Sequence, residues 1–358
     1  MQNQLAKFGM APGVLAVAAA ALLGGCGGAQ SSAALSPFVP RQAGGDVALT
    51  MPHYVRRTVH PDRSVSSVSP NAKAAKMLLY VGDWSTNDVY LYDYKSGAPV
   101  GTLTGNDEPY GMCVDAKGDM YVANFGSGTV NEYAHGGTLI QSYSTAGELI
   151  GCAVDAKGDV AATSFDPGDV TVFAKGNPEA GTTYSDSACE YMWTMGYDDN
   201  GNLVGIGEYS SIAVCALLAG SKTMTTLQTI GFTVWFAGGT TWDGKYLALG
   251  DQEVGGKYES GVARATLKGN TLTFVSSTTF SDNCDSDYTD DVNPFIVGKK
   301  NTPANRKQGN AMVGPNLWCI DAGAPKVDYW HYPAGGLPYN DLSSPPDEPY
   351  GAGVSIAQ

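Results

Sequence analysis

Five acidic residues occupy positions from which they could act together. Glu108 and Glu348 each lie in an Asp-Glu-Pro-Tyr-Gly sequence, with Asp107 and Asp347 in front of them, and Glu148 has the same place in a related segment. Carboxylates that are brought together raise one another's pKa unless a cation lies between them. Carboxylate oxygens are also the ligands that Ca²⁺ prefers. The sequence therefore predicts a divalent-cation site, with Ca²⁺ the expected ion; the alternative is a set of solvated loop acids.

Other candidates for chemistry are weaker. Catalysis by a nucleophile needs a base, usually His, and only His135 and His331 occur after residue 76. Neither has a partnering motif, so we predict no catalytic residue. The acidic stretch 282–291 lacks the Gly and the distal Glu of an EF-hand loop, which leaves either a generic calcium loop or a polar surface loop.

Aromatic residues lie close to the same acidic segments. They are Tyr110, Tyr350, Trp193 and Trp235. Exposed rings at these places could form a platform for a sugar or an aromatic ligand, and buried ones would pack neighbouring sheets together. Both interpretations are open at this point.

The acidic segments belong to an internal repeat. Residues 111–124 align with 151–164, which gives a period of 40 residues, and weaker copies surround Asp198 and Asp243. Each unit has an apolar run ending in Asp, a Gly turn, a second run rich in β-branched or aromatic residues, and another turn. We expect these Asp residues to cap the turns. Periods of 40 to 50 residues are typical of propellers, and Glu108, Glu148 and Glu348 have equivalent places, with Glu190 nearby in a fourth unit.

The two ends of the chain supply complementary parts of one unit. Segments 77–83, 88–94 and 99–103 match the second, third and fourth strands, whereas 350–357 matches only the first. We therefore predict an all-β fold, a six-bladed β-propeller closed by the C-terminal strand completing the N-terminal blade. The other blades are expected to start near residues 110, 150, 192, 233 and 293.

The repeat resembles bacterial six-bladed propellers of the NHL and YVTN kind, including secreted propeller lipoproteins. The residues that carry the resemblance are Pro109, Gly111 to Asp115, Gly118, Tyr121 to Asn124 and Thr129-Val130. Metal-dependent lactonases and streptogramin lyases have similar six-bladed folds, and the resemblance makes such an enzyme the alternative function. Their ligand sets do not match this chain residue by residue.

The N-terminal region predicts export. Residues 1–26 have a basic start, an apolar run and Leu23-Gly24-Gly25-Cys26, which resembles a lipobox. The resemblance implies that the chain is cleaved before Cys26 and lipid-attached there. Gly27 after it favours the outer membrane where a cell has one, with the protein facing the periplasm or the cell surface. Residues 27–76, rich in Gly, Ala, Ser and Pro, are predicted to be a flexible tether, and 77–358 the propeller domain.

Six further cysteines are compatible with disulfides in an exported protein, and buried free thiols are the alternative. They are Cys113, Cys152, Cys189, Cys215, Cys284 and Cys319. Six cysteines allow 15 pairings, and the sequence does not choose among them.

The charge limits the partners. The chain has 21 Lys and Arg against 35 Asp and Glu, a net charge of −14. A surface of this sign repels phosphate backbones, so nucleic acid is not expected as a partner. The favoured function is a monomeric, lipid-tethered module, without enzymatic activity, that binds a protein or a small ligand at an acidic channel mouth.

Overall fold

The computed structural model describes Ser66–Ala357 except for residues 209–210, 236–237, 252–253, 255–260, 281–294, 298–315, 322–325, 339 and 343. Contacts divide the chain into Met1–Leu35 and Ser36–Gln358, and every described residue lies in the second unit. Its elements are almost all strands, which confirms the prediction of an all-β fold. No helix in the described part is long and apolar enough to cross a membrane.

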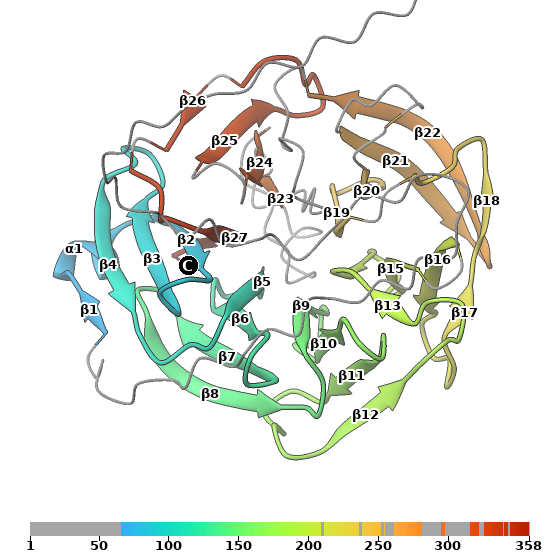
Figure 1. The fold of residues 1–358 in the computed structure, drawn as a ribbon, viewed down its shortest axis with the longest axis horizontal. Helices are drawn as coiled ribbons and strands as arrows, with labels where there is room; N and C mark the ends of the chain where they lie inside the picture. Colours follow the sequence, from blue (N-terminus) through green and yellow to red (C-terminus); the bar gives the residue numbers. More distant parts are fainter. Residues whose placement is uncertain are drawn as a thin grey trace, which may run out of the picture. The chain divides into compact units, whose positions relative to one another are not determined.

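The described strands form six sheets that follow one another around a centre (Figure 1). In sheet 1 the order is β1-β4-β3-β2-β27, and sheets 2 and 3 have the orders β5-β6-β7-β8 and β9-β10-β11-β12. The bounds of these strands are β1 Ser67–Val68, β2 Met77–Asp83, β3 Asp88–Asp93, β4 Pro99–Leu103, β5 Pro109–Val114, β6 Met120–Asn124, β7 Thr129–Ala134, β8 Thr138–Ser144, β9 Leu149–Val154, β10 Val160–Ser164, β11 Val170–Phe173, β12 Gly181–Tyr184 and β27 Pro349–Ile356.

Sheets 4 to 6 contain the rest of the strands. Sheet 4 has the order β13-β15-β16-β17 with β14 also on β15, sheet 5 the order β18-β22-β21-β20-β19, and sheet 6 the order β23-β24-β25-β26. The bounds are β13 Tyr191–Met192, β14 Gly196–Tyr197, β15 Leu203–Glu208, β16 Ile212–Leu217, β17 Thr225–Thr226, β18 Gln228–Ile230, β19 Thr240–Trp242, β20 Leu247–Asp251, β21 Gly261–Lys268, β22 Thr271–Thr279, β23 Phe295–Val297, β24 Asn316–Asp321, β25 Lys326–His331 and β26 Asn340–Asp341.

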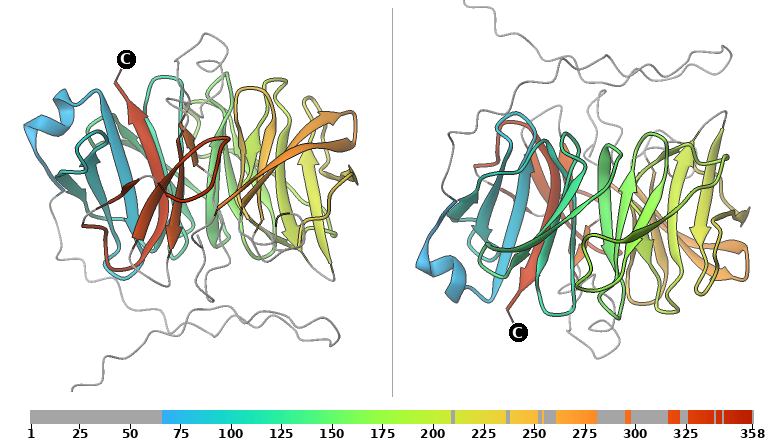
Figure 2. Two further views of the ribbon diagram at one scale, coloured as in Figure 1. Left: turned by 90° about the horizontal axis from the view of Figure 1, so that it is seen from above. Right: turned by 90° about the horizontal axis from the view of Figure 1, so that it is seen from below.

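The C-terminal strand pairs with the first long strand of the chain. β27 runs antiparallel to β2, with Met77 opposite Ile356 and Gly82 opposite Gly351. Both views in Figure 2 place β27 among the strands of the N-terminal sheet. The prediction that the last strand supplies the inner strand of the N-terminal sheet is confirmed. β27 therefore gives β2 a partner on the edge that would otherwise be open.

Apolar side chains are buried between neighbouring sheets, where strands near the centre such as β6, β9 and β10 are covered on both faces. Separate clusters join sheet 1 to sheet 2 and sheet 2 to sheet 3. Others join sheet 3 to sheet 4, sheet 4 to sheet 5, and sheet 6 to sheet 1. Sheets 5 and 6 meet at Asp243, whose Oδ2 accepts hydrogen bonds from Arg264 Nε at 2.8 Å and from the Tyr332 hydroxyl at 2.7 Å.

The repeated Asp residues cap turns, as predicted. Asp115 Oδ1 accepts hydrogen bonds from the backbone N–H groups of Lys117 and Asp119. Asp155, Asp198 and Asp243 make the same kind of contact in their own turns. Burial raises the pKa of Asp115, while these N–H groups act in the opposite direction. The aspartates thus have a structural role.

Two boundaries differ from the prediction. The last residues of the predicted tether contain β1 and the helix α1 (Pro70–Ala74), which Ser69 caps through its side chain. The fifth inner strand, β19, begins at Thr240 and not near 233, because the preceding residues first form β18, parallel to β22 at the outer edge. A short parallel outer strand has no alternating pattern that separates it from a loop.

Candidate functional site

The three glutamates precede inner strands that lie side by side in register. A Cβ added to Gly351 would lie 1.5 Å from the Tyr110 carbonyl oxygen, and one added to Gly111 would lie 2.4 Å from that of Ile150. These glycines let the backbones of β27, β5 and β9 approach closely. Each glutamate stands three residues before the Gly of its strand. Glu348, Glu108 and Glu148 therefore occupy neighbouring places at one end of these strands, which we call the mouth.

The same backbone hydrogen bond holds all three glutamates. The carbonyl oxygen of Glu348 accepts from the Trp84 N–H at 3.0 Å, that of Glu108 from Phe125 at 3.0 Å, and that of Glu148 from Phe165 at 2.8 Å. In each case the donor directly follows the second strand of the sheet. The predicted equivalence of the three positions is confirmed in the backbone.

A second repeated contact fixes the residue in front of the glutamates. The side chain that ends the second strand accepts a hydrogen bond from that residue's N–H: Asp83 Oδ2 from Asp347 at 3.1 Å, and Asn124 Oδ1 from Asp107 at 3.1 Å. In sheet 5, Asp251 accepts from Trp235 at 3.3 Å. These acceptors are buried. The sequence signal for them was a polar residue at the end of each second strand; Asn124 was part of the repeat, but no contact was predicted for it.

Glu108 has a strained backbone. Among described residues other than glycine, only Asn87 and Glu108 have positive φ, 61° and 54°. They contact each other, because the Glu108 N–H donates to Asn87 Oδ1 at 2.8 Å. The left-handed conformation costs an L-residue about 1–2 kcal/mol, and Asn tolerates it better than Glu. Such strain is found often at functional positions.

We expect Glu108→Asn to be more stable than the matched variant Glu148→Asn by about 0.5–1 kcal/mol, because only position 108 has a positive φ. Both substitutions remove one carboxylate from equivalent places. Urea unfolding followed by circular dichroism measures the difference. Equal stability of the two variants, or a less stable Glu108→Asn, would contradict the interpretation of strain.

Aromatic rings pack against one another next to the backbone bonds of the glutamates, because Trp84 and Phe125 are themselves the donors of two of these bonds. Trp84 contacts Tyr350, Tyr110 and Phe125 with ring centroids 5.1–5.8 Å apart. Tyr110 and Trp193 are buried, so they pack the sheets together, whereas Trp235 is 53% exposed. Sequence reasoning missed Trp84, Phe125 and Phe165; the signal was an aromatic residue directly after each polar strand end, as in Asp83-Trp84.

The acidic side chains differ in exposure. Asp347 and Glu148 are exposed, while Asp107, Glu108 and Glu348 are partly buried. Within the described part of the chain, no three His, Cys, Asp or Glu side chains are grouped so that they could hold a metal ion. Binding of Ca²⁺ by these five residues therefore stays a prediction, because their side chains do not form a ready-made set of metal ligands in the described part of the chain. The acidic stretch 282–291 lies outside the described residues.

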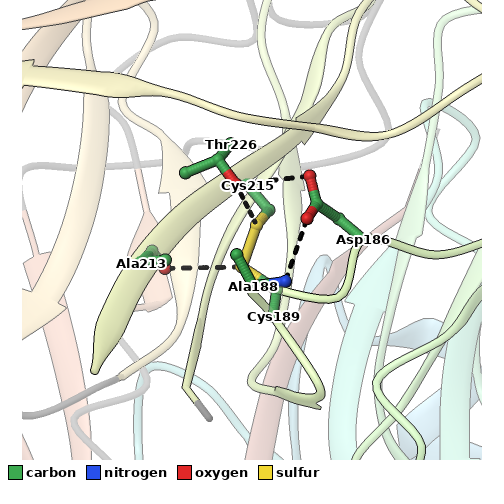
Figure 3. The surroundings of a disulfide bond; sticks show 6 residues. All are labelled: Asp186, Ala188, Cys189, Ala213, Cys215 and Thr226. Atoms are coloured by element: carbon green, nitrogen blue, oxygen red, sulfur yellow. Dashed lines mark hydrogen bonds between the residues drawn. A yellow bond between two sulfur atoms is a disulfide. The ribbon is translucent and has the colours of Figure 1, made fainter. Parts of the chain in front are cut away.

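A disulfide fixes the fourth loop of this end, next to Glu190. Cys189 is bonded to Cys215 of β16 (Figure 3). The carboxylate of Asp186 accepts hydrogen bonds from the Ala188 N–H at 3.0 Å and from the Thr226 hydroxyl at 3.3 Å. The loop that carries Glu190 into β13 is thus tied to the third and fourth strands of its own sheet.

A second disulfide joins Cys113 of β5 to Cys152 of β9, the inner strands of sheets 2 and 3. The side chain of Cys284 and that of Cys319 lie outside the described residues. The sequence left every pairing open, and the structure selects two.

His135 has partners that the sequence did not indicate. Its Nδ1 lies 2.6 Å from Ser355 Oγ, and its Nε2 lies 2.8 Å from the Ala75 carbonyl oxygen. Ser355 is buried and also contacts the Gly118 carbonyl oxygen. Ser355 stands where other units have the capping Asp, and this departure was the signal. The buried Ser355 hydroxyl and the His135 imidazole, whose two nitrogens both have hydrogen-bond partners, link β27 to sheet 2. His331 ends β25 and is exposed.

The link predicts a pH dependence of stability. Burial lowers the pKa of His135 below its usual 6.5. The unfolded chain then binds more protons than the native protein just below pH 6.5, so the free energy of unfolding falls as pH falls through this range. We expect His135→Gln to remove this part of the slope.

Chemical denaturation at a series of pH values between 7.5 and 5.5 measures the slope of both proteins. Asp119, whose carboxylate interacts with the His135 backbone, has a pKa raised by burial and acts with the opposite sign at lower pH. Because Asp119 is present in both proteins, its contribution to the pH dependence of stability cancels when the two profiles are compared. Parallel profiles for wild type and His135→Gln would refute the assignment.

Comparisons with known proteins show the fold class. The model of the SMP-30/gluconolactonase/LRE-like region matches residues 59–154. A search of curated proteins found no match. A crystal structure of a nidogen/laminin complex contains a similar chain, with 13% identity, a TM-score of 0.55, and coverage of 79% of this chain and 99% of that one.

Two further solved structures are a streptogramin B lyase and a virginiamycin B lyase from Staphylococcus aureus. The first has 13% identity, a TM-score of 0.45 and 78% coverage of both chains. The second has 11% identity, a TM-score of 0.42, and coverage of 74% of this chain and 84% of that one. Together with the strand order, the family match and the nidogen/laminin likeness define an all-β, propeller-like protein.

Proposed function

We propose that this chain is an exported, lipid-anchored, six-bladed β-propeller, closed by β27, that binds a positively charged ligand at its mouth without enzymatic activity. The pairing of β27 with β2 and the apolar clusters between successive sheets support the closed ring. The lipobox at Cys26 supports the anchor. The expected place is the outer membrane, and no nucleic acid is expected as a partner.

The observation that carries the function is the repeated fixing of three glutamates. Glu348, Glu108 and Glu148 are held by the same backbone bond on adjacent inner strands. Three glutamates whose backbones are held at neighbouring places favour a cationic ligand, since carboxylates attract cations through space. Because the described residues contain no ready-made metal cluster, an organic cation such as a basic peptide fits better than Ca²⁺ alone.

Calorimetric titration with a lysine-rich peptide, and separately with Ca²⁺, tests the proposal. Binding of the peptide should weaken about tenfold or more in a variant that combines Glu108→Gln, Glu148→Gln and Glu348→Gln, since each charge-assisted contact contributes about 1.5–3 kcal/mol. Glu179→Gln is the control, because Glu179 is exposed in the turn between β11 and β12. Lack of binding by the wild type, or equal binding by the triple variant, would overturn the proposal.

The second candidate is a metal-dependent enzyme. The match of residues 59–154 to the gluconolactonase-containing family favours it. Hydrolysis of lactones by the purified protein in the presence of divalent metals, lost in the triple glutamine variant, would place this candidate first. Inactivity in all metals tested would favour the binding module.

A further inference from the structure

Every lysine whose side chain the structure describes lies at the end of the strands away from the mouth. Most stand in or next to turns that join the first strand of a sheet to the second, as Lys117 does between β5 and β6, or the third to the fourth, as Lys175 does between β11 and β12. Lys73 of α1 lies against Gly136, in the turn between β7 and β8, and Lys76 precedes β2 at the same end. We call this end the lysine face. Its lysines, all exposed, are Lys73, Lys76, Lys95, Lys117, Lys157, Lys175, Lys222, Lys245 and Lys268.

The acidic residues of the lysine face are largely withdrawn into its turns. Asp115 and Asp198 are buried, and each accepts hydrogen bonds from backbone N–H groups of its own turn. Among the acids described in these turns, only Glu179 and Asp199 are exposed. The charge that this face presents to a partner is therefore mainly that of its ammonium groups.

The mouth has the opposite character. Its described connections, which join the second strand of a sheet to the third and the fourth to the next sheet, contain no Lys or Arg. In addition to the five acids already named, they contain Asp166, Asp169, Asp186 and Glu190. The described part of the protein thus has an acidic face and a lysine-bearing face at opposite ends of the same strands.

Only one pairing of these faces between two molecules brings opposite charges together. At 0.15 M salt a charge acts over about 8 Å, so facing groups matter more than the net charge of −14 on the chain. Two mouths would place carboxylates against carboxylates, and two lysine faces ammonium groups against ammonium groups. A mouth against a lysine face is complementary. The lysines belong to sheets 1 to 5 and the acids to the connections of sheets 1 to 4, so the match extends around the centre of the ring.

We propose that the lysine face binds the mouth of a second copy of this chain. The two faces differ, so the contact is heterologous, and its repetition gives an open stack of copies unless the rotation between them closes. The part played by the mouth rests on the function proposed above, with the lysines of the second copy as its positively charged ligand. Exposed ion pairs contribute little individually, so the contact is weak and depends on concentration. We predicted a monomer from the sequence, and this proposal departs from that expectation.

Sedimentation velocity of the full chain with Cys26→Ser, which lacks the thiol expected to carry lipid, tests the proposal. The average mass should rise with protein concentration at 0.15 M salt and fall to that of the monomer at 1 M, where the screening length is about 3 Å. Lys117→Glu combined with Lys157→Glu should lower the association constant about tenfold or more, because each reversal replaces an attraction by a repulsion. Glu179→Lys, on the same exposed face, should raise it.

A mixing experiment identifies the two faces. The Lys117 and Lys157 double variant has an intact mouth, and the variant with Glu108→Gln, Glu148→Gln and Glu348→Gln has an intact lysine face. Each should stay monomeric by itself. Their mixture should form a one-to-one dimer and no larger species, because one complementary pair of faces remains. Circular dichroism melting of each variant separates loss of contact from loss of fold.

Four results would overturn the proposal: a wild type that is monomeric at all concentrations, association that high salt does not weaken, association that the lysine variant retains, or variants that form no dimer when mixed. Binding of a monomeric wild type to vesicles of phosphatidylglycerol would assign the lysine face to an anionic lipid surface instead. A monomeric wild type that binds the lysine-rich peptide would remove the stacking and leave the binding function in place.

Discussion

Gly351→Ala is expected to destabilise the protein by about 3 kcal/mol or more, or to prevent its folding. The added Cβ would lie 1.5 Å from the Tyr110 carbonyl oxygen and 2.6 Å from its carbonyl carbon. Both are backbone atoms, so no side-chain rotation relieves the overlap. β27 and β5 would have to separate, and with them the packing of Tyr350 on Tyr110, whose ring centroids are 5.2 Å apart. Thermal and urea unfolding measure the loss.

Two other glycines calibrate this effect. Gly111→Ala places its Cβ 2.4 Å from the Ile150 carbonyl oxygen and should also be strongly destabilising. At Gly105 an added Cβ meets no atom within 4 Å, and only its positive φ of 83° opposes the change, so Gly105→Ala should cost about 1–2 kcal/mol. If Gly351→Ala proves no worse than Gly105→Ala, the inner strands do not pack backbone to backbone.

The repeat explains how much of the fold could be predicted from the sequence. The second Asp-Glu-Pro-Tyr-Gly matches the start of an inner strand, and residues 77–103 match the other three strands of a unit, so the pairing of β2 with β27 follows from a pattern only one motif long. The predicted start of the fifth inner strand, near residue 233, was wrong, because β19 begins at Thr240. β18 pairs in parallel with β22, and its three residues carry no alternation that could have indicated an outer strand.

For the candidate site, the sequence predicted the equivalent backbone positions of the three glutamates but not their side-chain contacts. Equal spacing from the capping position, which is Asp115, Asp155 or Ser355, was sufficient to place Glu108, Glu148 and Glu348 at equivalent positions. Sequence spacing gives no information on how side chains meet across sheets, so the partner of Glu108 at Asn87, 21 residues earlier, could not be seen. The contact between His135 and Ser355 spans 220 residues and was equally hidden.

The disulfide between Cys113 and Cys152 follows from a difference of one residue in the repeat. Cys113 is two residues after Gly111, whereas Cys152 directly follows Gly151. Side chains alternate between the two faces of a strand, so the two cysteines point to opposite faces of their own sheets and meet in the space between sheets 2 and 3. The residue equivalent to Cys152 in sheet 2, Met112, packs on the other side, toward sheet 1.

Removal of this disulfide is the other change with a large expected effect. We expect Cys113→Ala combined with Cys152→Ala to lower the free energy of unfolding by about 4 kcal/mol, since the bond closes a long loop and restricts the unfolded chain. The sequence separation is 39 residues, against 26 for Cys189 and Cys215. The corresponding double alanine variant of the second pair should lose slightly less, roughly 3.5 kcal/mol.

Guanidinium unfolding under oxidising conditions measures both losses, and peptide mapping of the unreduced wild type identifies the bonds. Reductant should destabilise each variant less than it destabilises the wild type, because one of the two bonds is already absent. A linked peptide that joins Cys113 to any cysteine other than Cys152 would contradict the pairing. So would a double alanine variant as stable as the wild type, because the two inner strands would then hold their register without the covalent bond between sheets 2 and 3.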